Sequence, residues 1–501
     1  MHRAYKIIVV IAVSACAVNL SRADQPGNGT LSIRPARHSE LSLRPCHVPN
    51  LDDEVRCGTY EVYEDRAARV GRKIGLNIVV IPALNPKHAP DPVVWLHGGP
   101  GAAATQTAGA AREDFLAGVR HDRDLVFVDQ RGTGKSNPLN CDLGDSPDDL
   151  KAFFGELLPR GKVRECREKL EKTANLKLYT TQIAMDDLDE VRAALGYETI
   201  NIAAASYGTI AAQAYMRQHP TRVRAVFLLG VATPGVKQPL LFPRAAQHAL
   251  DLLFEDCAAD QSCHSAYPNL HQEFDSVLAR FNSGPISVEM INPASKQKES
   301  VQLFRGSFVE RIRLFLYTTT FASFVPLVIH RAYDNSYLPF EAVSINYNPP
   351  SILARGMYMT ITCSEGIPFI SEQNIVRETT GTFVGDYRIR AHIEACKEWP
   401  KGEVSRSFIG PVKSNLPVIM ISGELDGSTP PWYAKTALGY MPNGRQLNIR
   451  YYGHQTDSPC IWTILSGFIQ KGSVKGLDTS CAENIKRPPF AMELPKQFSL
   501  Q

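Results

Sequence analysis

The sequence predicts an α/β fold built on a mostly parallel sheet. Short apolar, β-rich segments alternate with helical segments over the first half of the chain, and strand-like segments return after residue 416. Between them, residues 231–415 have a mainly helical pattern. Strands that alternate with helices favour a parallel sheet, because each crossover needs a helix-sized connection. We therefore expect a core sheet with a largely helical cap inserted between two late strands.

Seven segments carry the strand prediction. Each is short, apolar and rich in β-formers, which suits strands buried on both faces. They are residues 77–83, 92–96, 124–129, 199–204, 223–229, 417–422 and 447–452. Helices are predicted at 182–195, from the spacing of the apolar residues, and at 207–219, where Pro220 ends the pattern.

The expected organisation follows from these segments. Residues 24–75 form an N-terminal extension, 76–230 the first part of the core, 231–415 the cap and 416–501 the second part of the core.

Composition excludes several classes of protein. The 501 residues are 44% hydrophobic and 21% charged, as in ordinary globular proteins. Lys and Arg number 54 against 51 Asp and Glu, which gives a net charge of +3. A charge this close to zero argues against nucleic acid as the partner.

The first residues resemble an export signal. A basic start at His2, Arg3 and Lys6 precedes the apolar run 7–15. Cleavage after Ala23 is one option, which makes 1–23 a signal peptide. In the other, Cys16 ends a lipobox-like sequence and carries a lipid anchor. No later segment has the roughly 18 uninterrupted apolar residues of a membrane helix. We expect a periplasmic or secreted protein with no transmembrane span.

The cysteines agree with export. Without Cys16, ten of the eleven remain, an even number, and no CxxC pair suggests zinc or a redox motif. Sequence alone does not fix connectivity. Sequential pairing is the simplest hypothesis, because short loops close at low entropic cost. The sequential pairs are Cys46 with Cys57, Cys141 with Cys166, Cys257 with Cys263, Cys363 with Cys396 and Cys460 with Cys481.

A candidate nucleophile lies where a predicted strand meets a helix. The segment 204–208 reads A-A-S-Y-G, with Ser206 at the junction. A nucleophile elbow places serine on a sharp strand-to-helix turn with small neighbours, usually as G-x-S-x-G. Ala204 replaces the first glycine and is still small. The alternative is a serine that caps the helix.

A glycine-rich turn, H-G-G-P-G at 97–101, follows the strand at 92–96. Glycines there let backbone N–H groups point at a developing oxyanion. We predict Gly99 as one donor and Tyr207, the residue after the candidate nucleophile, as the other.

A second glycine-containing segment imitates a phosphate-binding loop. Residues 129–136 read D-Q-R-G-T-G-K-S and end in G-K-S after a strand. The P-loop requires a glycine where Asp129 stands, so nucleotide binding is rejected. Asp129 and Arg131 are interpreted as structural.

An acid and a base follow two late strands. Asp426 lies just after 417–422, and His454 just after 447–452. A serine hydroxyl needs a histidine to accept its proton and a carboxylate to orient that histidine. The order Ser206, Asp426, His454 matches the α/β-hydrolase arrangement.

Together, HGGPG, DQRGTGKS and the serine in A-A-S-Y-G, with Asp and His far downstream, resemble the proline iminopeptidase and secreted tripeptidyl aminopeptidase family of α/β-hydrolases. The resemblance runs from about residue 76 to residue 481. It implies a serine aminopeptidase that acts on peptides with free N-termini through an acyl-enzyme, with no metal or organic cofactor. It also implies a cap carboxylate for the substrate's ammonium group. Glu365 is the candidate, with a solvated surface glutamate as the alternative.

Two other functions stay open. The same three residues would serve a carboxylesterase or another small-molecule hydrolase, because fold does not fix substrate. A catalytically silent binding protein on this scaffold is disfavoured by the intact Ser206, Asp426 and His454.

Overall fold

The computed structural model describes residues 41–111, 117–347, 353–454 and 458–498. These residues belong to one compact unit. The predicted signal at 1–23, the lipidation candidate Cys16 and the first part of the predicted N-terminal extension lie outside the described residues. In the described ranges, no helix combines the length and the apolar character needed to cross a membrane.

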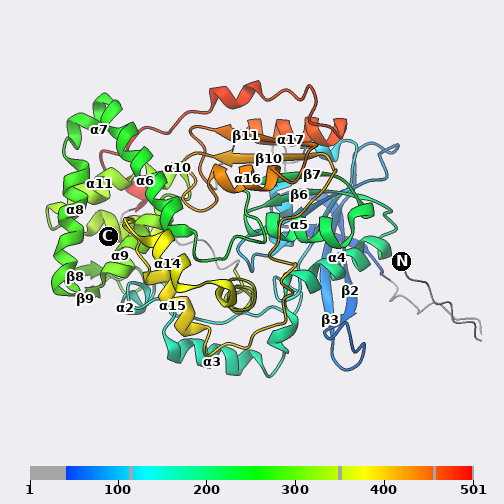
Figure 1. Ribbon diagram of the computed structural model, residues 1–501, viewed down its shortest axis with the longest axis horizontal. Helices are drawn as coiled ribbons and strands as arrows, with labels where there is room; N and C mark the ends of the chain where they lie inside the picture. The colour runs from blue at the N-terminus through cyan, green and yellow to red at the C-terminus, as the bar shows by residue number, and fades with distance from the viewer. Residues whose placement is uncertain (1–40, 112–116, 348–352, 455–457, 499–501) are drawn as a thin grey trace, which may run out of the picture. The chain divides into compact units, whose positions relative to one another are not determined.

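A nine-stranded sheet forms the core of the described chain (Figure 1). Its order is β1-β2-β3-β5-β4-β6-β7-β10-β11. The run from β5 to β11 is parallel, and β1, β2 and β3 pair antiparallel at one edge. The strands are β1 Arg44–Val48, β2 Leu51–Tyr63, β3 Lys73–Ile81, β4 Val93–Leu96, β5 Leu125–Val128, β6 Ile200–Ala205, β7 Val223–Leu229, β10 Val418–Gly423 and β11 Gly444–Ile449. The predicted mostly parallel α/β sheet is confirmed.

Two differences from the sequence interpretation stand out. β1 and β2 lie in the region interpreted as an extension, yet they pair in the same sheet as the core strands. The last strand, predicted at 447–452, spans Gly444–Ile449. Pairing with β10 sets these limits, because Val418 is opposite Gly444 and Gly423 is opposite Ile449. His454 therefore lies at the end of a longer loop than expected.

Helices cover both faces of the sheet. Side chains alternate along each strand, so Val126 faces one apolar cluster and Phe127 the other. The first cluster includes residues of α4 (Thr181–Ala194) and α5 (Tyr207–Gln218), and the second includes residues of α1 (Ala117–Arg120) and α17 (Pro459–Lys471). The central strands β4, β5, β7 and β10 are thus buried on both sides, as their nearly continuous apolar sequences require. The remaining elements outside the cap insertion are η1 Ala104–Ala111, α2 Leu150–Phe153, α3 Arg160–Leu170, η2 Leu176–Leu178, η3 Pro220–Arg222, α16 Pro431–Leu438, η7 Ser480–Asn484 and η8 Lys496–Phe498.

The cap is inserted between β7 and β10, as predicted, and is largely helical (Figure 1). It has an apolar core of its own, in which Phe308, Phe315 and Phe340 are fully buried. Its elements are α6 Phe242–Ala259, α7 Gln261–Ala266, α8 Leu270–Arg280, η4 Phe281–Ser283, β8 Ile286–Ile291, β9 Lys298–Leu303, α9 Arg305–Phe315, α10 Thr319–Ala322, α11 Val325–Tyr333, α12 Leu338–Asn346, α13 Arg355–Ile361, η5 Thr362–Gly366, η6 Ile367–Phe369, α14 Glu372–Thr379 and α15 Tyr387–Ala395. The antiparallel pair β8–β9 was not foreseen from the sequence.

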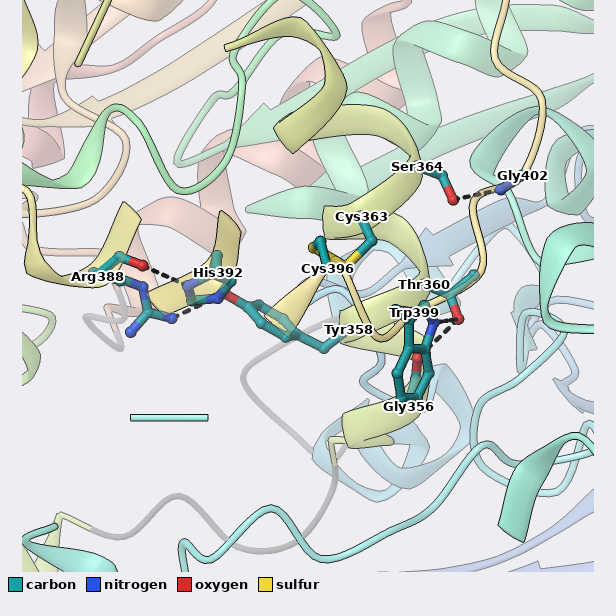
Figure 2. The surroundings of a disulfide bond; sticks show 10 residues. All are labelled: Gly356, Tyr358, Thr360, Cys363, Ser364, Arg388, His392, Cys396, Trp399 and Gly402. Atoms are coloured by element: carbon teal, nitrogen blue, oxygen red, sulfur yellow. Dashed lines mark hydrogen bonds between the residues drawn. A yellow bond between two sulfur atoms is a disulfide. The ribbon is translucent and has the colours of Figure 1, made fainter. Parts of the chain in front are cut away.

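Five disulfides join cysteines that are neighbours in the sequence. They are Cys46–Cys57, Cys141–Cys166, Cys257–Cys263, Cys363–Cys396 and Cys460–Cys481. Figure 2 shows the fourth, which ties the π-helical turn after α13 to the end of α15. This bond holds two cap helices together beside the site described below.

Candidate active site

Ser206 occupies a sharp turn between β6 and α5. Its φ of 56° and ψ of −128° are unusual for a residue other than glycine. The turn brings the helix very close to β4, since a Cβ on Gly208 would lie 2.2 Å from the Leu96 carbonyl oxygen. Ala204 is fully buried, so its small side chain is accommodated where the usual pattern has glycine. The strand, turn and helix have the form of a nucleophile elbow.

His454 lies within hydrogen-bond distance of both other predicted residues. Its Nε2 is 2.9 Å from Ser206 Oγ, and its Nδ1 is 2.9 Å from Asp426 Oδ2. The loops after β6, β10 and β11 supply the three side chains, so one edge of the parallel sheet brings them together. The cap contributes as well, because the Tyr317 carbonyl accepts a 2.7 Å hydrogen bond from the His454 N–H.

Asp426 is fully buried and heavily hydrogen-bonded. It accepts bonds from the N–H groups of Ser428 and Thr429 at 2.8 and 2.7 Å, and from Thr429 Oγ1 at 2.7 Å. Burial by itself would raise the pKa of this carboxyl, but the charge and hydrogen bond of His454 and the bonds from Thr429 hold it below its usual value. Asp426 is therefore a carboxylate at neutral pH.

Thr429 was missed by the sequence reasoning. Its Oγ1 lies 2.9 Å from His454 Nδ1 as well as 2.7 Å from Asp426 Oδ2, so it contacts both residues. A hydroxyl can donate to the carboxylate while it accepts from the imidazole. The only sequence signal was its place three residues after the acid, in the loop after β10.

The predicted oxyanion loop lies against the serine. A Cβ on Gly98 would be 2.7 Å from Ser206 Cβ and 3.2 Å from its Oγ. His97 accepts a 2.6 Å hydrogen bond from the Gly98 N–H, and burial lowers the pKa of His97 to about 4, so its ring is neutral. Within the described residues, neither the Gly99 nor the Tyr207 N–H donates a hydrogen bond. Gly99 lines the cavity described below, whereas Tyr207 is not among its lining residues.

Asp129 and Arg131 have structural contacts. The Asp129 carboxylate accepts bonds from Asn77, Thr105 and the Lys135 N–H. A Cβ on Gly134 would lie 2.2 Å from Asp129 Oδ2, so the loop wraps the carboxylate and leaves no space there for a phosphate. Fully buried, Arg131 forms a two-pronged ion pair with Asp187 at 2.6 and 2.9 Å.

Glu365, the residue predicted to bind a substrate ammonium group, lies in the π-helical turn after α13, beside the cavity that contains Ser206 on its wall. It is not among the residues that line that cavity. Instead, its two oxygens accept 2.6 Å bonds from the N–H and the hydroxyl of Thr181, at the start of α4. Burial raises the pKa of Glu365 to about 7, against the effect of these bonds. The π-helical turn after α13 points the side chain toward the core helices, and no sequence pattern reveals that direction.

A cavity of about 800 Å³ lies over the serine. Ser206, His454, Gly98 and Gly99 line it on the core side, and residues from α9, α13 and α15 line it on the cap side. The cap wall is unusually polar and carries Glu310, Arg311, Arg313, Tyr358, Arg388 and His392. These residues were missed because an amphipathic helix pattern does not show which cavity its polar side faces. Among the described residues, no cluster of three or more metal-ligating side chains is present.

Comparisons with known proteins bear on the fold and the class of this chain. A family model described as "alpha/beta hydrolase fold" matches residues 91–260, and one described as "TAP-like protein" matches residues 381–481. Serine protease Hip1 of Mycobacterium tuberculosis is 24% identical over 434 residues, which cover 79% of this chain and 82% of that protein. Tripeptidyl aminopeptidase of Streptomyces coelicolor is 28% identical over 200 residues, or 37% of each chain. A crystal structure of proline iminopeptidase from Mycobacterium smegmatis aligns over 85% of this chain and 97% of that one, at 15% identity and a TM-score of 0.39.

The fold and these matches define the class of the protein, which is a serine hydrolase with the α/β-hydrolase fold. Within that class, the chain is similar to peptidases named as serine protease, tripeptidyl aminopeptidase and proline iminopeptidase.

Proposed function

We propose that this protein is an exported serine aminopeptidase, which hydrolyses peptide bonds near free N-termini. Ser206 is the nucleophile, His454 the general base and Asp426 the acid that orients the histidine. The observation that carries the proposal is a chain of two hydrogen bonds, each 2.9 Å long. One joins Ser206 Oγ and His454 Nε2, and the other joins His454 Nδ1 and Asp426 Oδ2. Ser206 and His454 line a cavity covered by the cap.

The reaction is acyl transfer in two steps. His454 Nε2 accepts the Ser206 proton while Oγ attacks the scissile carbonyl carbon, and the resulting oxyanion is stabilised by the N–H groups of Gly99 and Tyr207. The imidazolium then gives its proton to the leaving amine, and the C–N bond breaks. Water repeats the sequence on the acyl-enzyme and releases the acid product and the free serine.

The preference for chain ends rests on the cap. Cap residues line the cavity opposite Ser206, so a substrate enters a covered space and does not lie across an open groove. The relative named above as tripeptidyl aminopeptidase points the same way.

Export rests on the cysteines and on the first residues. Ten cysteines form five disulfides among the described residues, a number typical of oxidising compartments. The basic and apolar start of the sequence is typical of a secretory signal, with lipidation at Cys16 as the alternative. Mass spectrometry of the mature N-terminus distinguishes cleavage after Ala23 from a lipid on Cys16.

A fluorophosphonate probe tests the nucleophile. The folded wild-type protein should be labelled on Ser206, and the Ser206→Ala variant should not be labelled while it retains the wild-type melting temperature. Absence of labelling in the wild type would instead favour a silent binding protein.

A matched substrate series tests the activity. The same peptides are offered with free and with acetylated N-termini, beside simple acyl esters. We expect cleavage of the free peptides only. Equal cleavage of free and acetylated peptides would contradict an aminopeptidase, and turnover of esters alone would identify an esterase.

A further inference from the structure

The cap side of the cavity carries more positive than negative charge. Arg311, Arg313 and Arg388 all line it, from helices α9 and α15. We call these three residues the arginine wall. Glu310 is the carboxylate in direct contact with it, so one negative charge faces three guanidinium groups.

Glu310 forms ion pairs with two of these arginines. Arg313 donates to it from Nε at 3.0 Å and from Nη2 at 2.5 Å, and Arg388 Nη1 forms a second ion pair with it. Burial opposes the charge, but the two arginines together lower the pKa of Glu310 to about 2. The carboxylate is therefore ionised throughout the neutral range and balances only one of its two partners.

Each of the two arginines retains a buried donor without an acceptor. In the part of the chain that the structure describes, Arg313 Nη1 and Arg388 Nε have no hydrogen-bond partner within 3.5 Å. The Tyr317 hydroxyl lies close enough to Arg313 to act as a hydrogen-bond acceptor that raises the pKa of its guanidinium. The Arg313 side chain is only 1% exposed. Buried donors on charged groups are costly to leave unpaired, so such groups are ordinarily matched by an acceptor. Both Arg313 Nη1 and Arg388 Nε are closed off from the cavity, so they contribute to the positive charge of its wall and are not themselves contacts for a ligand.

His392 does not supply the missing negative charge or acceptor. Its Nδ1 donates to the Arg388 carbonyl at 2.7 Å, so Nε2 accepts from the Tyr358 hydroxyl at 2.9 Å. Tyr358 in turn accepts a 2.9 Å bond from Arg388 Nη2 (Figure 2). Burial first, and the Arg388 charge second, lower the pKa of His392 to about 3, so the ring is neutral. The network fixes Arg388 in position and does not neutralise its positive charge.

The other charged residues that line the cavity do not neutralise the excess positive charge of the arginine wall. Arg355 is paired with Asp145, and Glu156 is exposed to solvent, where water screens its charge. Arg311 lies 3.6 Å from the centre of the Phe153 ring and donates to the Phe153 carbonyl. It forms no salt bridge with a carboxylate among the described residues.

The arginine wall is connected to the reacting groups. The Arg313 guanidinium lies over the Tyr317 ring, 5.1 Å from its centre, and that ring meets the His454 ring edge-on at 5.0 Å. One aromatic side chain therefore separates the positive charge from the imidazole. A substrate held by the wall would have its scissile bond near Ser206 within the same cavity.

We propose that the arginine wall binds a carboxylate of the substrate, and that the enzyme is selective for peptides that carry one close to the cleaved bond. Arg388, which is partly exposed, and Arg311, which forms no salt bridge with a described carboxylate, present their guanidinium groups to the cavity, and guanidinium groups match carboxylates in shape and charge. This inference rests on the proposed peptidase activity of the same cavity. The carboxylate comes either from an Asp or Glu side chain or from the C-terminus of a short peptide.

Binding to the Ser206→Ala variant separates these two sources. Calorimetry would measure the affinities of tripeptides and tetrapeptides that carry either Glu or Gln at each position in turn and have amidated C-termini. The affinities of the Gln peptides would then be measured again with free C-termini. At one position or at the free C-terminus, the carboxylate peptide should bind about tenfold more tightly than its neutral counterpart. Equal affinities throughout would overturn the proposal.

Two substitutions with opposite expected effects test whether the arginine wall is the group that binds the carboxylate. Arg388→Met should bring the Glu-to-Gln ratio of affinities close to one, whereas Glu310→Gln should increase it, because it frees donors for the substrate. A merely structural role would weaken all peptides alike in both variants. Arg390→Met on the same helix is the matched control, since Arg390 is exposed and pairs with Glu372 and Asp386 outside the cavity.

A smaller ligand tests the wall without relying on peptidase activity. Glutarate should protect wild-type Ser206 from fluorophosphonate labelling, and its diamide should not. If glutarate protects Ser206 but the protein cleaves no peptide, the proposed function is refuted, whereas the proposed carboxylate site is supported. If glutarate and its diamide protect equally, and Glu and Gln peptides bind equally, the carboxylate site is refuted whatever the enzyme cleaves.

Discussion

Replacing Gly98 by alanine would put a methyl group into the contact between the oxyanion loop and the elbow. The new Cβ would lie 2.7 Å from Ser206 Cβ and 3.2 Å from the Ala205 carbonyl oxygen. Ordinary contacts between carbon atoms begin at about 3.5 Å, so the overlap with Ser206 is about 0.8 Å. Ser206 cannot move away cheaply, because its backbone already has an unusual φ of 56°.

The overlap predicts a large effect on rate and a modest effect on stability. Overpacking of this kind costs about 1–3 kcal/mol. If the loop and the serine move apart by most of the overlap, two features of the site change. These are the 2.9 Å contact between Ser206 Oγ and His454 Nε2 and the direction of the Gly99 N–H. A displacement of about 1 Å at reacting groups costs about 100-fold in rate.

The assay is kcat/KM on the best free peptide, measured beside the melting temperature. Gly161→Ala in α3 is the control, because a Cβ there meets nothing within 4 Å. It should leave kcat/KM unchanged and alter stability by no more than about 1 kcal/mol. If Gly98→Ala retains half or more of the wild-type kcat/KM, the close approach of the loop to the serine is not a functional constraint and the reasoning is refuted.

Three further predictions concern the acid, a buried glutamate and a disulfide. Asp426→Asn should lower kcat about 10³–10⁴-fold in single-turnover assays, because the amide no longer stabilises the imidazolium. The free energy of unfolding should decrease by up to about 3 kcal/mol as pH rises from 4.5 through 7, since the folded state raises the pKa of Glu365 to about 7, and Glu365→Gln should abolish that component in urea titrations. Loss of Cys363–Cys396, which spans 33 residues, should cost about 3–4 kcal/mol by the chain-entropy relation, measured by thermal unfolding.

Two of these predictions have a matched control, and the third has a result that would contradict it. Glu403→Gln, an exposed site, should leave the pH dependence of unfolding at its wild-type shape, and an identical shape for Glu365→Gln would count against the buried-glutamate argument. Cys257–Cys263 spans only 6 residues, so its loss should cost about 2 kcal/mol, and a larger cost there would contradict the loop-length reasoning. For Asp426→Asn, activity within tenfold of wild type would contradict its role.

Much of the fold could be predicted from local sequence. β7 has the predicted limits, and β4, β6 and β10 differ from theirs by one residue at the ends, because apolar β-rich runs can be satisfied only inside a sheet covered on both faces. The elbow could be placed as well, since a small-residue junction between strand and helix is a local feature. β3 and β11 are the exceptions. β3 spans Lys73–Ile81 where 77–83 was predicted, and the limits of both strands follow their pairing with β2 and β10, respectively, and not their own composition.

The sequence by itself determined that a serine, an acid and a histidine follow three strands, and parallel strands bring such loops to one edge of the sheet. Only the tertiary structure decided what surrounds them. Thr429 beside the acid, Glu365 turned toward Thr181 and the arginine wall opposite Ser206 all depend on the direction in which a loop or cap helix presents its side chains. Those directions follow from packing between segments far apart in the chain, which no local pattern encodes.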